Sequence, residues 1–145
     1  MNEQLKKLYQ SVILKNNNDP SHFEKREEAS YVLEAYNQIC GDRFKLYFDI
    51  ENDKITQLSF HGFGCAISKA STSVLVKKIE GKTPEQVKSI LNSFLNTVKP
   101  DQEIPENTED DFLAFAAARD FPGRLKCATL SWEEMGNFLT KNLKK

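Results

Sequence analysis

The residues of this sequence that could do chemistry together are three cysteines and one aspartate, spread along the chain. A single glycine separates Cys40 from Asp42, and the other two thiols, Cys65 and Cys127, follow much later. Three thiolates and a carboxylate make a complete tetrahedral ligand set for Zn²⁺, which accepts sulfur and oxygen donors without redox change. The same positions could hold an iron–sulfur cluster, whose preferred ligands are thiolates. All four residues are therefore candidate metal ligands.

The spacing of these cysteines does not by itself decide their role. They lie far apart, no CxxC pair is present, and free cysteine is among the residue types most often buried, so a packing role is the more frequent outcome for such a pattern. The context of Cys65 favours chemistry. It follows the glycine-containing run Gly62-Phe-Gly and precedes a helical pattern, so its thiol lies at a helix N-terminus, where unpaired N–H groups favour the thiolate. Gly41 permits the tight turn that a Cys-x-Asp pair needs to hold one ion.

Composition places the chain in a broad class. The 145 residues predict one domain, 1–145. A formal charge of −1 without a basic block argues against nucleic-acid binding. No apolar run is long enough to span a bilayer, and the first residues lack a signal-peptide core, so we expect a cytoplasmic protein that does not bind a membrane. An odd number of cysteines in that reducing compartment argues against a disulfide framework.

The first half of the chain predicts a helix and then three strands. Apolar residues recur at helical spacing over 3–14, and a polar surface connection follows at 21–28. A β-prone run covers 29–36. The run 43–50 alternates cleanly, with Phe44 on one face and Tyr47 on a face that we expect to be wet. After turn residues, 54–60 returns, so the three strands form an antiparallel meander.

The second half predicts helices. One begins after Cys65 and ends at Gly81, and a second follows Thr83-Pro-Glu-Gln86, an N-cap with a capping box. Acidic residues 101–111 read as a solvated loop ahead of a short helix that Phe121-Pro-Gly123 ends. Ser131 and Glu134 then suggest the capping box of a C-terminal helix, which places Cys127 in or just ahead of its first turn. The expected class is α+β, a three-stranded antiparallel sheet with helices packed on one face, and all three thiols at the ends of elements.

We expect no catalytic or metal-binding role for the other polar residues considered. His22 lies in the polar connection and His61 next to Phe60, so each is expected to be a surface or packing histidine. Ser68, Ser71 and Ser73 lack a histidine base in their sequence context, which leaves serine hydrolase chemistry without support.

Three segments resemble the U-type iron–sulfur assembly family. They are Cys40-Gly-Asp42, Gly62-Phe-Gly-Cys-Ala-Ile-Ser-Lys-Ala-Ser71 and Arg124-Leu-Lys-Cys-Ala-Thr-Leu-Ser-Trp132. Lys126 stands where the scaffold branch has a histidine, and residues 81–111 supply an insertion that this branch lacks, so the chain is most similar to the SufU branch. Asn37-Gln38-Ile39 departs from the usual asparagine-proline pair.

The resemblance implies a Zn²⁺ bound by Cys40, Asp42, Cys65 and Cys127. It also implies that Cys40 accepts persulfide sulfur from a pyridoxal-phosphate cysteine desulfurase of the SufS type and relays it toward a downstream iron–sulfur assembly scaffold, which would make the protein a zinc-dependent sulfurtransferase. Two alternatives remain open. The same four positions could build a [2Fe–2S] cluster on a scaffold protein, or zinc could merely close the fold of a binding module.

Overall fold

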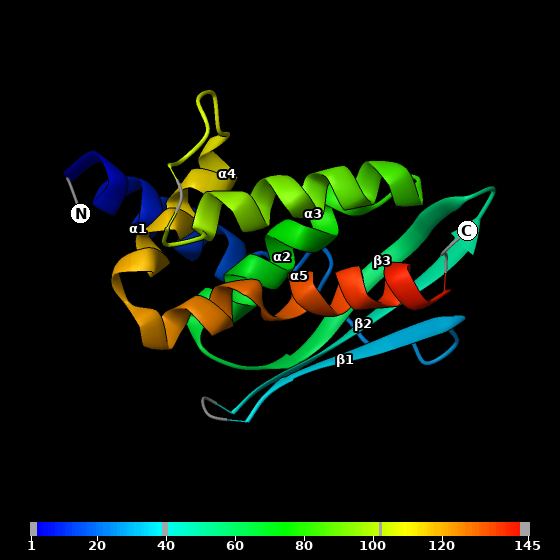
Figure 1. Ribbon diagram of the computed structural model, residues 1–145. Coiled ribbons are helices and arrows are strands. Elements are labelled where there is room, and N and C mark those ends of the chain that lie inside the picture. The colour runs from blue at the N-terminus through cyan, green and yellow to red at the C-terminus, as the bar shows by residue number, and fades with distance from the viewer. Residues whose placement is uncertain (1–2, 39–40, 102, 143–145) are drawn as a thin grey trace.

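The computed structural model describes residues 3–38, 41–101 and 103–142 as a three-stranded sheet with a set of helices (Figure 1). In chain order the elements are α1 (Glu3–Asn17), β1 (Tyr31–Asn37), β2 (Asp42–Glu51), β3 (Lys54–Phe63), α2 (Ala66–Ile79), α3 (Pro84–Val98), α4 (Asp110–Leu113), the 3₁₀ helix η1 (Ala114–Asp120) and α5 (Pro122–Asn142). None of the helices in these ranges is long and apolar enough to cross a bilayer.

The sheet is the predicted antiparallel meander, with strand order β1-β2-β3. A two-residue turn joins β2 to β3. Both turn residues, Asn52 and Asp53, have positive φ (51° and 65°), which is the geometry that matches the twist of the flanking strands. Asparagine and aspartate tolerate this conformation better than most residues. The turn chemistry of the sequence therefore sets the register of this hairpin.

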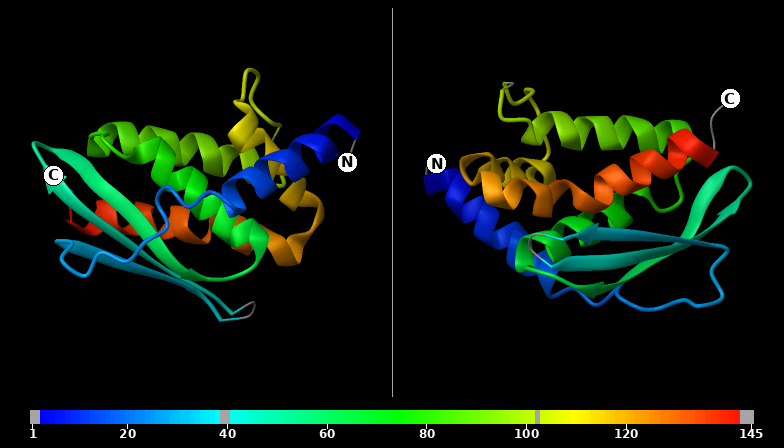
Figure 2. Two further views of the ribbon diagram at one scale, coloured as in Figure 1. Left: turned by 180° about the vertical axis from the view of Figure 1, so that it is seen from behind. Right: turned by 60° about the horizontal axis from the view of Figure 1, so that its bottom comes forward.

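Helices cover one face of the sheet, as predicted (Figure 2). The alternation in β2 explains this, because Phe44, Leu46 and Phe48 are fully buried on the covered face. Helix α5 packs on β1 and α2 packs on β3. At one contact the ring of Phe138 from α5 meets the ring of Phe48 edge to face, with 5.2 Å between centroids. Helices α2 and α5 thus form the layer next to the sheet.

The insertion helix α3 forms part of the outer layer. Its predicted capping box is present, with the Thr83 hydroxyl accepting from the Gln86 N–H and the Gln86 side chain accepting from the Thr83 N–H. Phe94 of α3 stacks on Trp132 of α5, with ring centroids 3.9 Å apart and planes 6° apart. This stacked pair fixes α3 to the inner layer.

The start of α5 differs from the sequence prediction. The helix begins at Pro122, so Ser131 lies in its middle and is not an N-cap, and Cys127 lies inside the helix instead of at its end. Proline is favoured in the first turn because its missing N–H would have no helical partner there. Phe121-Pro122-Gly123 therefore both ends η1 and starts α5.

The outer face of the sheet is drier than expected at one position. Tyr47 was predicted to be wet, yet it is only 6% exposed. The connection at 21–28 pairs with the edge strand β3, where the Phe60 N–H donates to the His22 carbonyl at 2.9 Å. Its residues Lys25 and Glu27 line a pocket together with Tyr47, and Arg26 pairs with Asp49 at 3.2 Å. A segment too polar to belong to the core can still cover a strand through backbone and charged contacts.

Candidate metal centre

Asp42 is the first residue of β2 and is fully buried. Its Oδ1 accepts a hydrogen bond from the Cys65 backbone N–H at 2.9 Å. Its Oδ2 is buried and has no hydrogen-bond partner among the described residues. Burying a charged oxygen without a partner is costly, so such groups are normally paired or bind a metal. The bare oxygen of Asp42 therefore indicates a place for a cation.

Cys65 caps the N-terminus of α2, as the sequence predicted. Its backbone is extended, and its Sγ accepts a hydrogen bond from the Ser68 N–H at 3.4 Å. The approach to this cap needs glycine. A Cβ on Gly64 would lie 2.6 Å from Asp42 Oδ1, and one on Gly62 would lie 2.1 Å from the Arg43 carbonyl oxygen. These two glycines let the end of β3 pass close to β2 and bring Cys65 to Asp42.

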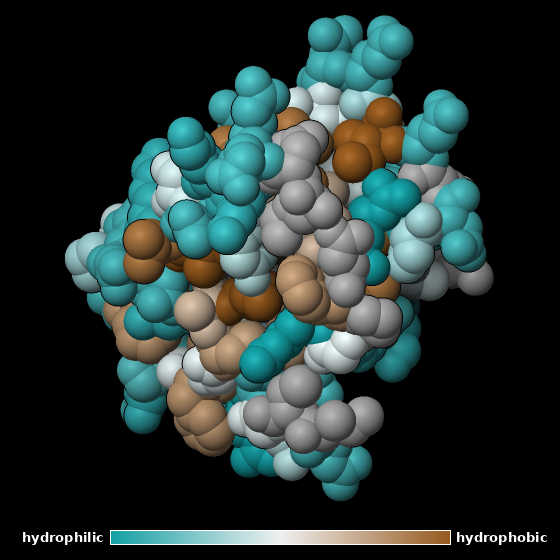
Figure 3. Space-filling view, turned by 90° about the vertical axis from the view of Figure 1, so that its left-hand side faces the viewer, coloured by the Kyte–Doolittle hydropathy of each residue, from teal (hydrophilic) through white to brown (hydrophobic). Residues whose placement is uncertain are grey.

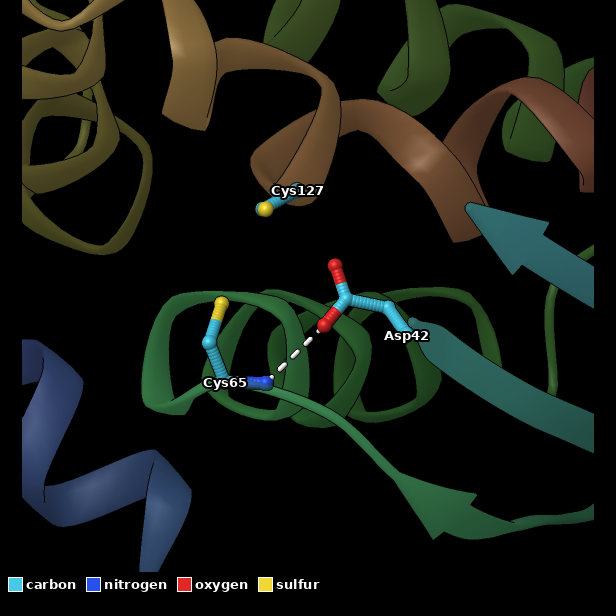
Figure 4. A group of neighbouring side chains, drawn as sticks. All are labelled: Asp42, Cys65 and Cys127. Atoms are coloured by element: carbon cyan, nitrogen blue, oxygen red, sulfur yellow. Dashed lines mark hydrogen bonds between the residues drawn. The ribbon is translucent and has the colours of Figure 1, made fainter. Parts of the chain in front are cut away.

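Cys127 comes to the same place from α5, and its side chain is 1% exposed. One ligand atom from each of Asp42, Cys65 and Cys127 lies within 4.8 Å of the others. Figure 4 shows both sulfurs and the free carboxylate oxygen bordering a common space. Tetrahedral zinc, with Zn–S near 2.3 Å, places its ligand atoms roughly 3.5 to 3.8 Å apart, so a small contraction around a cation completes the geometry. The donor set fits Zn²⁺.

Cys40, the fourth predicted ligand, lies outside the described residues, so its role stays a prediction. The turn beside it is described. Gly41 has φ of +74°, and its N–H donates to the Asn37 carbonyl at 2.7 Å. A positive φ is readily adopted only by a residue without Cβ. The tight turn expected of the Cys-x-Asp pair is therefore present at its middle residue.

The chain was compared with known proteins and protein families. Residues 8–128 match the model of the family described as NifU-like N terminal domain. The chain belongs to this family. It is 31% identical to the zinc-dependent sulfurtransferase SufU of Bacillus subtilis, covering 97% of this chain and 95% of SufU. It is 27% identical to the iron–sulfur cluster assembly scaffold protein IscU of Thermotoga maritima, covering 94% and 95%.

A solved structure shows the same likeness. The crystal structure of FiSufU from the thermophile Fervidobacterium islandicum AW-1 superimposes with a TM-score of 0.80 at 33% identity, covering 90% of this chain and 96% of that one. The predicted α+β fold and the resemblance to the U-type assembly family are both confirmed.

A groove opens beside Cys65 in this NifU-like domain. Its volume is about 520 Å³. The lining residues come from α1, from the start of α2 and from the η1–α5 junction: Lys6, Tyr9, Gln10, Ile13, Cys65, Ala66, Ile67, Phe121 and Arg124. Phe121 is 49% exposed. This end of the molecule shows hydrophobic side chains among hydrophilic ones (Figure 3). Cys65, a candidate metal ligand, therefore forms part of the groove wall.

Tyr9 is a neighbour of the centre that the sequence analysis assigned only to the apolar stripe of a helix. Burial raises the pKa of the Tyr9 phenol above its ordinary value, the negative charge of Cys65 and Cys127 raises it further, and Arg124 opposes both. Tyr9 and Cys65 line the same groove. Nothing in the spacing of the N-terminal helix indicated that they would be neighbours, because this depends on how α1 packs.

The two histidines have surface and packing contacts of the kind expected. His22 Nε2 lies 2.8 Å from Glu80 Oε1, and His61 stacks on Phe23 with 4.6 Å between centroids. Neither histidine belongs to the cluster of ligand atoms found among the described residues.

Proposed function

We propose that this protein is a zinc-dependent sulfurtransferase of iron–sulfur cluster assembly, working in the cytoplasm with a pyridoxal-phosphate cysteine desulfurase of the SufS type. Zn²⁺ is held by Cys40, Asp42, Cys65 and Cys127. The observation that carries the proposal is the convergence of two sulfurs and a buried carboxylate oxygen from three distant parts of the chain. That oxygen has no hydrogen-bond partner among the described residues. The name of the Bacillus subtilis relative supports zinc and sulfur transfer as the chemistry.

We assign different roles to the ligands because the structure around each of them differs. Cys127 is buried within α5, and Cys65 holds the first turn of α2 through its sulfur. These contacts suit ligands that stay in place. Cys40, which lies between β1 and β2 in the sequence, is the acceptor in this proposal. Zinc, when bound, keeps its thiolate ligands deprotonated at neutral pH.

Sulfur transfer to Cys40 is an ordinary thiol exchange. The Cys40 thiolate attacks the terminal sulfur of the desulfurase cysteine persulfide. A new S–S bond forms on Cys40, the S–S bond of the donor breaks, and the desulfurase cysteine leaves as a thiolate, so no net oxidant is consumed. The persulfide then passes by the same exchange to the downstream assembly scaffold.

The groove beside Cys65 is the docking surface that we assign to the desulfurase. Among the described residues its lining includes the cations Lys6 and Arg124 and no acidic side chain, together with the exposed ring of Phe121. This combination suits a partner segment that carries a carboxylate next to an apolar side chain, since complementary charge steers association and an aromatic ring supplies buried area.

A scaffold that builds a [2Fe–2S] cluster is the second candidate. It is favoured by the relatives named as IscU scaffold proteins, such as that of Thermotoga maritima. The resemblance to the SufU branch supports the sulfurtransferase instead, through Lys126 before the last cysteine and the insertion at 81–111, which contains α3. Metal analysis of protein purified anaerobically without added metal separates the two: colourless protein with one zinc per chain supports transfer, and iron with visible absorption supports the scaffold.

The decisive experiment measures desulfurase turnover of cysteine with and without this protein. We expect stimulation that is lost after the protein is treated with a chelator and restored by zinc. Cys40→Ala should keep bound zinc through the remaining ligands and lose stimulation. Cys127→Ala is the matched comparison and should lose both, because it removes a buried ligand. Normal stimulation by Cys40→Ala would refute the assignment of Cys40.

A further inference from the structure

Helices α2 and α5 are joined by two buried hydrogen-bond relays. In the first, Trp132 Nε1 donates to Ser71 Oγ at 2.9 Å, and that hydroxyl donates to the Ala128 carbonyl oxygen. In the second, Thr72 Oγ1 donates to the Ser68 carbonyl oxygen at 2.9 Å and lies 2.8 Å from Ser131 Oγ. Since a hydroxyl has one hydrogen, Ser131 is the donor to Thr72.

These relays lie close to the two sulfurs along the chain. Cys65 caps α2, the helix that carries Ser71 and Thr72. Cys127 directly precedes Ala128, whose carbonyl accepts the Ser71 hydrogen bond. The position of α5 along α2 therefore sets where the Cys127 sulfur stands relative to the Cys65 sulfur.

Hydrogen bonds fix such a position better than apolar contacts do. Dispersion contacts change gradually when two helices slide, whereas a hydrogen bond weakens steeply with distance and angle. Ser71, Thr72 and Ser131 are each at most 2% exposed. A shift of α5 along α2 would break the hydrogen bonds that cross between the two helices, Trp132–Ser71, Ser71–Ala128 and Ser131–Thr72. The bond from Thr72 to the Ser68 carbonyl lies within α2 and would remain.

Stability alone does not account for the relays. Replacing both partners of a buried hydrogen bond by apolar groups of similar shape can be nearly neutral. The neighbouring residues Val74, Leu75 and Val76 already bury apolar surface in the same helix. Polar pairs in an otherwise apolar interface are best attested as devices that specify one arrangement.

We propose that Ser71, Thr72 and Ser131 are positioning residues that fix the register of α5 on α2 and thereby the separation of the Cys65 and Cys127 sulfurs. The expected effect on metal affinity rests on the proposed function, whereas the effect on the register of the helices is independent of it. Partners outside the ligand shell typically change metal affinity by about 10- to 100-fold when removed.

The test uses the double variant Thr72→Val/Ser131→Ala, which removes both hydroxyls of one relay and leaves neither unpaired. We expect the midpoint of thermal unfolding of the metal-free protein to stay near that of wild type. We expect Zn²⁺ affinity, measured by competition with a chromophoric chelator, to fall about ten-fold or more. The thiolate and ligand-field bands of the Co²⁺-loaded protein should shift.

Two further variants keep the outcome specific. The single variant Thr72→Ser keeps the hydroxyl and should bind Zn²⁺ with wild-type affinity. Thr97→Val removes a buried hydroxyl that donates to the Ser93 carbonyl within α3, so it should leave affinity and the Co²⁺ spectrum unchanged.

A crystal structure of the double variant gives a readout that needs no metal. We expect α5 to be displaced along α2 relative to the wild-type structure. Unchanged register together with unchanged affinity would overturn the proposal. If the wild-type chain bound no zinc, the proposed function would fail, and a displaced α5 in the variant would still support positioning.

Discussion

The backbone N–H of Cys65 donates a hydrogen bond of 2.9 Å to Asp42 Oδ1, which joins the first residue of β2 to the residue that caps α2. The bond orients the carboxylate so that its second oxygen borders the space between the sulfurs of Cys65 and Cys127 (Figure 4). Asp42 is thus both a structural acceptor and a candidate ligand.

Asp42→Asn separates these two roles. The amide keeps an oxygen acceptor for the Cys65 N–H and removes the buried negative charge. We expect the metal-free variant to unfold near the wild-type temperature, because the amide replaces one unpartnered buried polar atom by another, and the rise in unfolding temperature on adding Zn²⁺ to shrink or vanish. Differential scanning calorimetry with and without zinc measures both. If zinc raised the unfolding temperature of Asp42→Asn as much as that of wild type, Asp42 would be excluded from the site.

Gly64→Ala tests the close approach of β3 to the site. The new methyl group would lie 2.6 Å from Asp42 Oδ1 and 2.9 Å from a ring carbon of Phe44, so the carboxylate must move. We expect a loss of about 1–3 kcal/mol in the free energy of unfolding, together with weaker zinc binding. Gly123→Ala is the control, since a Cβ there would meet no atom within 4 Å. Equal effects of the two variants in chemical denaturation would contradict the close approach.

Phe94→Ala tests how α3 is held. Phe94 is fully buried and stacks on Trp132, so its truncation should cost about 3–5 kcal/mol. Trp132 is the single tryptophan of the sequence, and its fluorescence reports directly on the loss of the stacked ring. Phe121→Ala, at a half-exposed ring, should change stability by less than about 0.5 kcal/mol. An unaltered emission spectrum in Phe94→Ala would show that the stack does not form.

Acid should destabilise the metal-free protein through Asp49. The hydrogen bond from the Ser30 backbone N–H, together with Arg26, holds the pKa of Asp49 below its ordinary value of 3.8. A carboxyl whose folded pKa is lowered stabilises the fold above its unfolded pKa, and this stability is lost as the pH falls below that value. Urea unfolding at pH 6 and pH 3 should show a smaller acid loss in Asp49→Asn than in wild type.

The control for the acid experiment is Asp53→Asn, in the exposed turn between β2 and β3. Asparagine tolerates the positive φ of that position, so the variant should keep the acid loss of the wild type. If Asp49→Asn and Asp53→Asn lost the same stability between the two pH values, another group would be responsible.

Local patterns of the sequence determined the elements and the class of chemistry. The alternation around Phe44 predicted a strand with one buried face, Thr83-Pro-Glu-Gln86 predicted a helix start, and the glycine-containing run before Cys65 predicted a capping thiol. Each of these depends on residues within about one turn or one hairpin, where steric and hydrogen-bonding preferences act directly. The family resemblance of the three cysteine segments was likewise readable without coordinates.

Tertiary packing decided what those patterns could not. The meeting of Asp42, Cys65 and Cys127 within 4.8 Å depends on the approach of β3 to β2 and on where α5 lies along α2. The sequence analysis placed Cys127 at the start of its helix, because nothing local distinguished a proline that ends one helix from a proline that begins the next. Contacts between residues distant in sequence form only when the whole hydrophobic core closes, so ligand convergence is a property of the assembled layers rather than of any single segment.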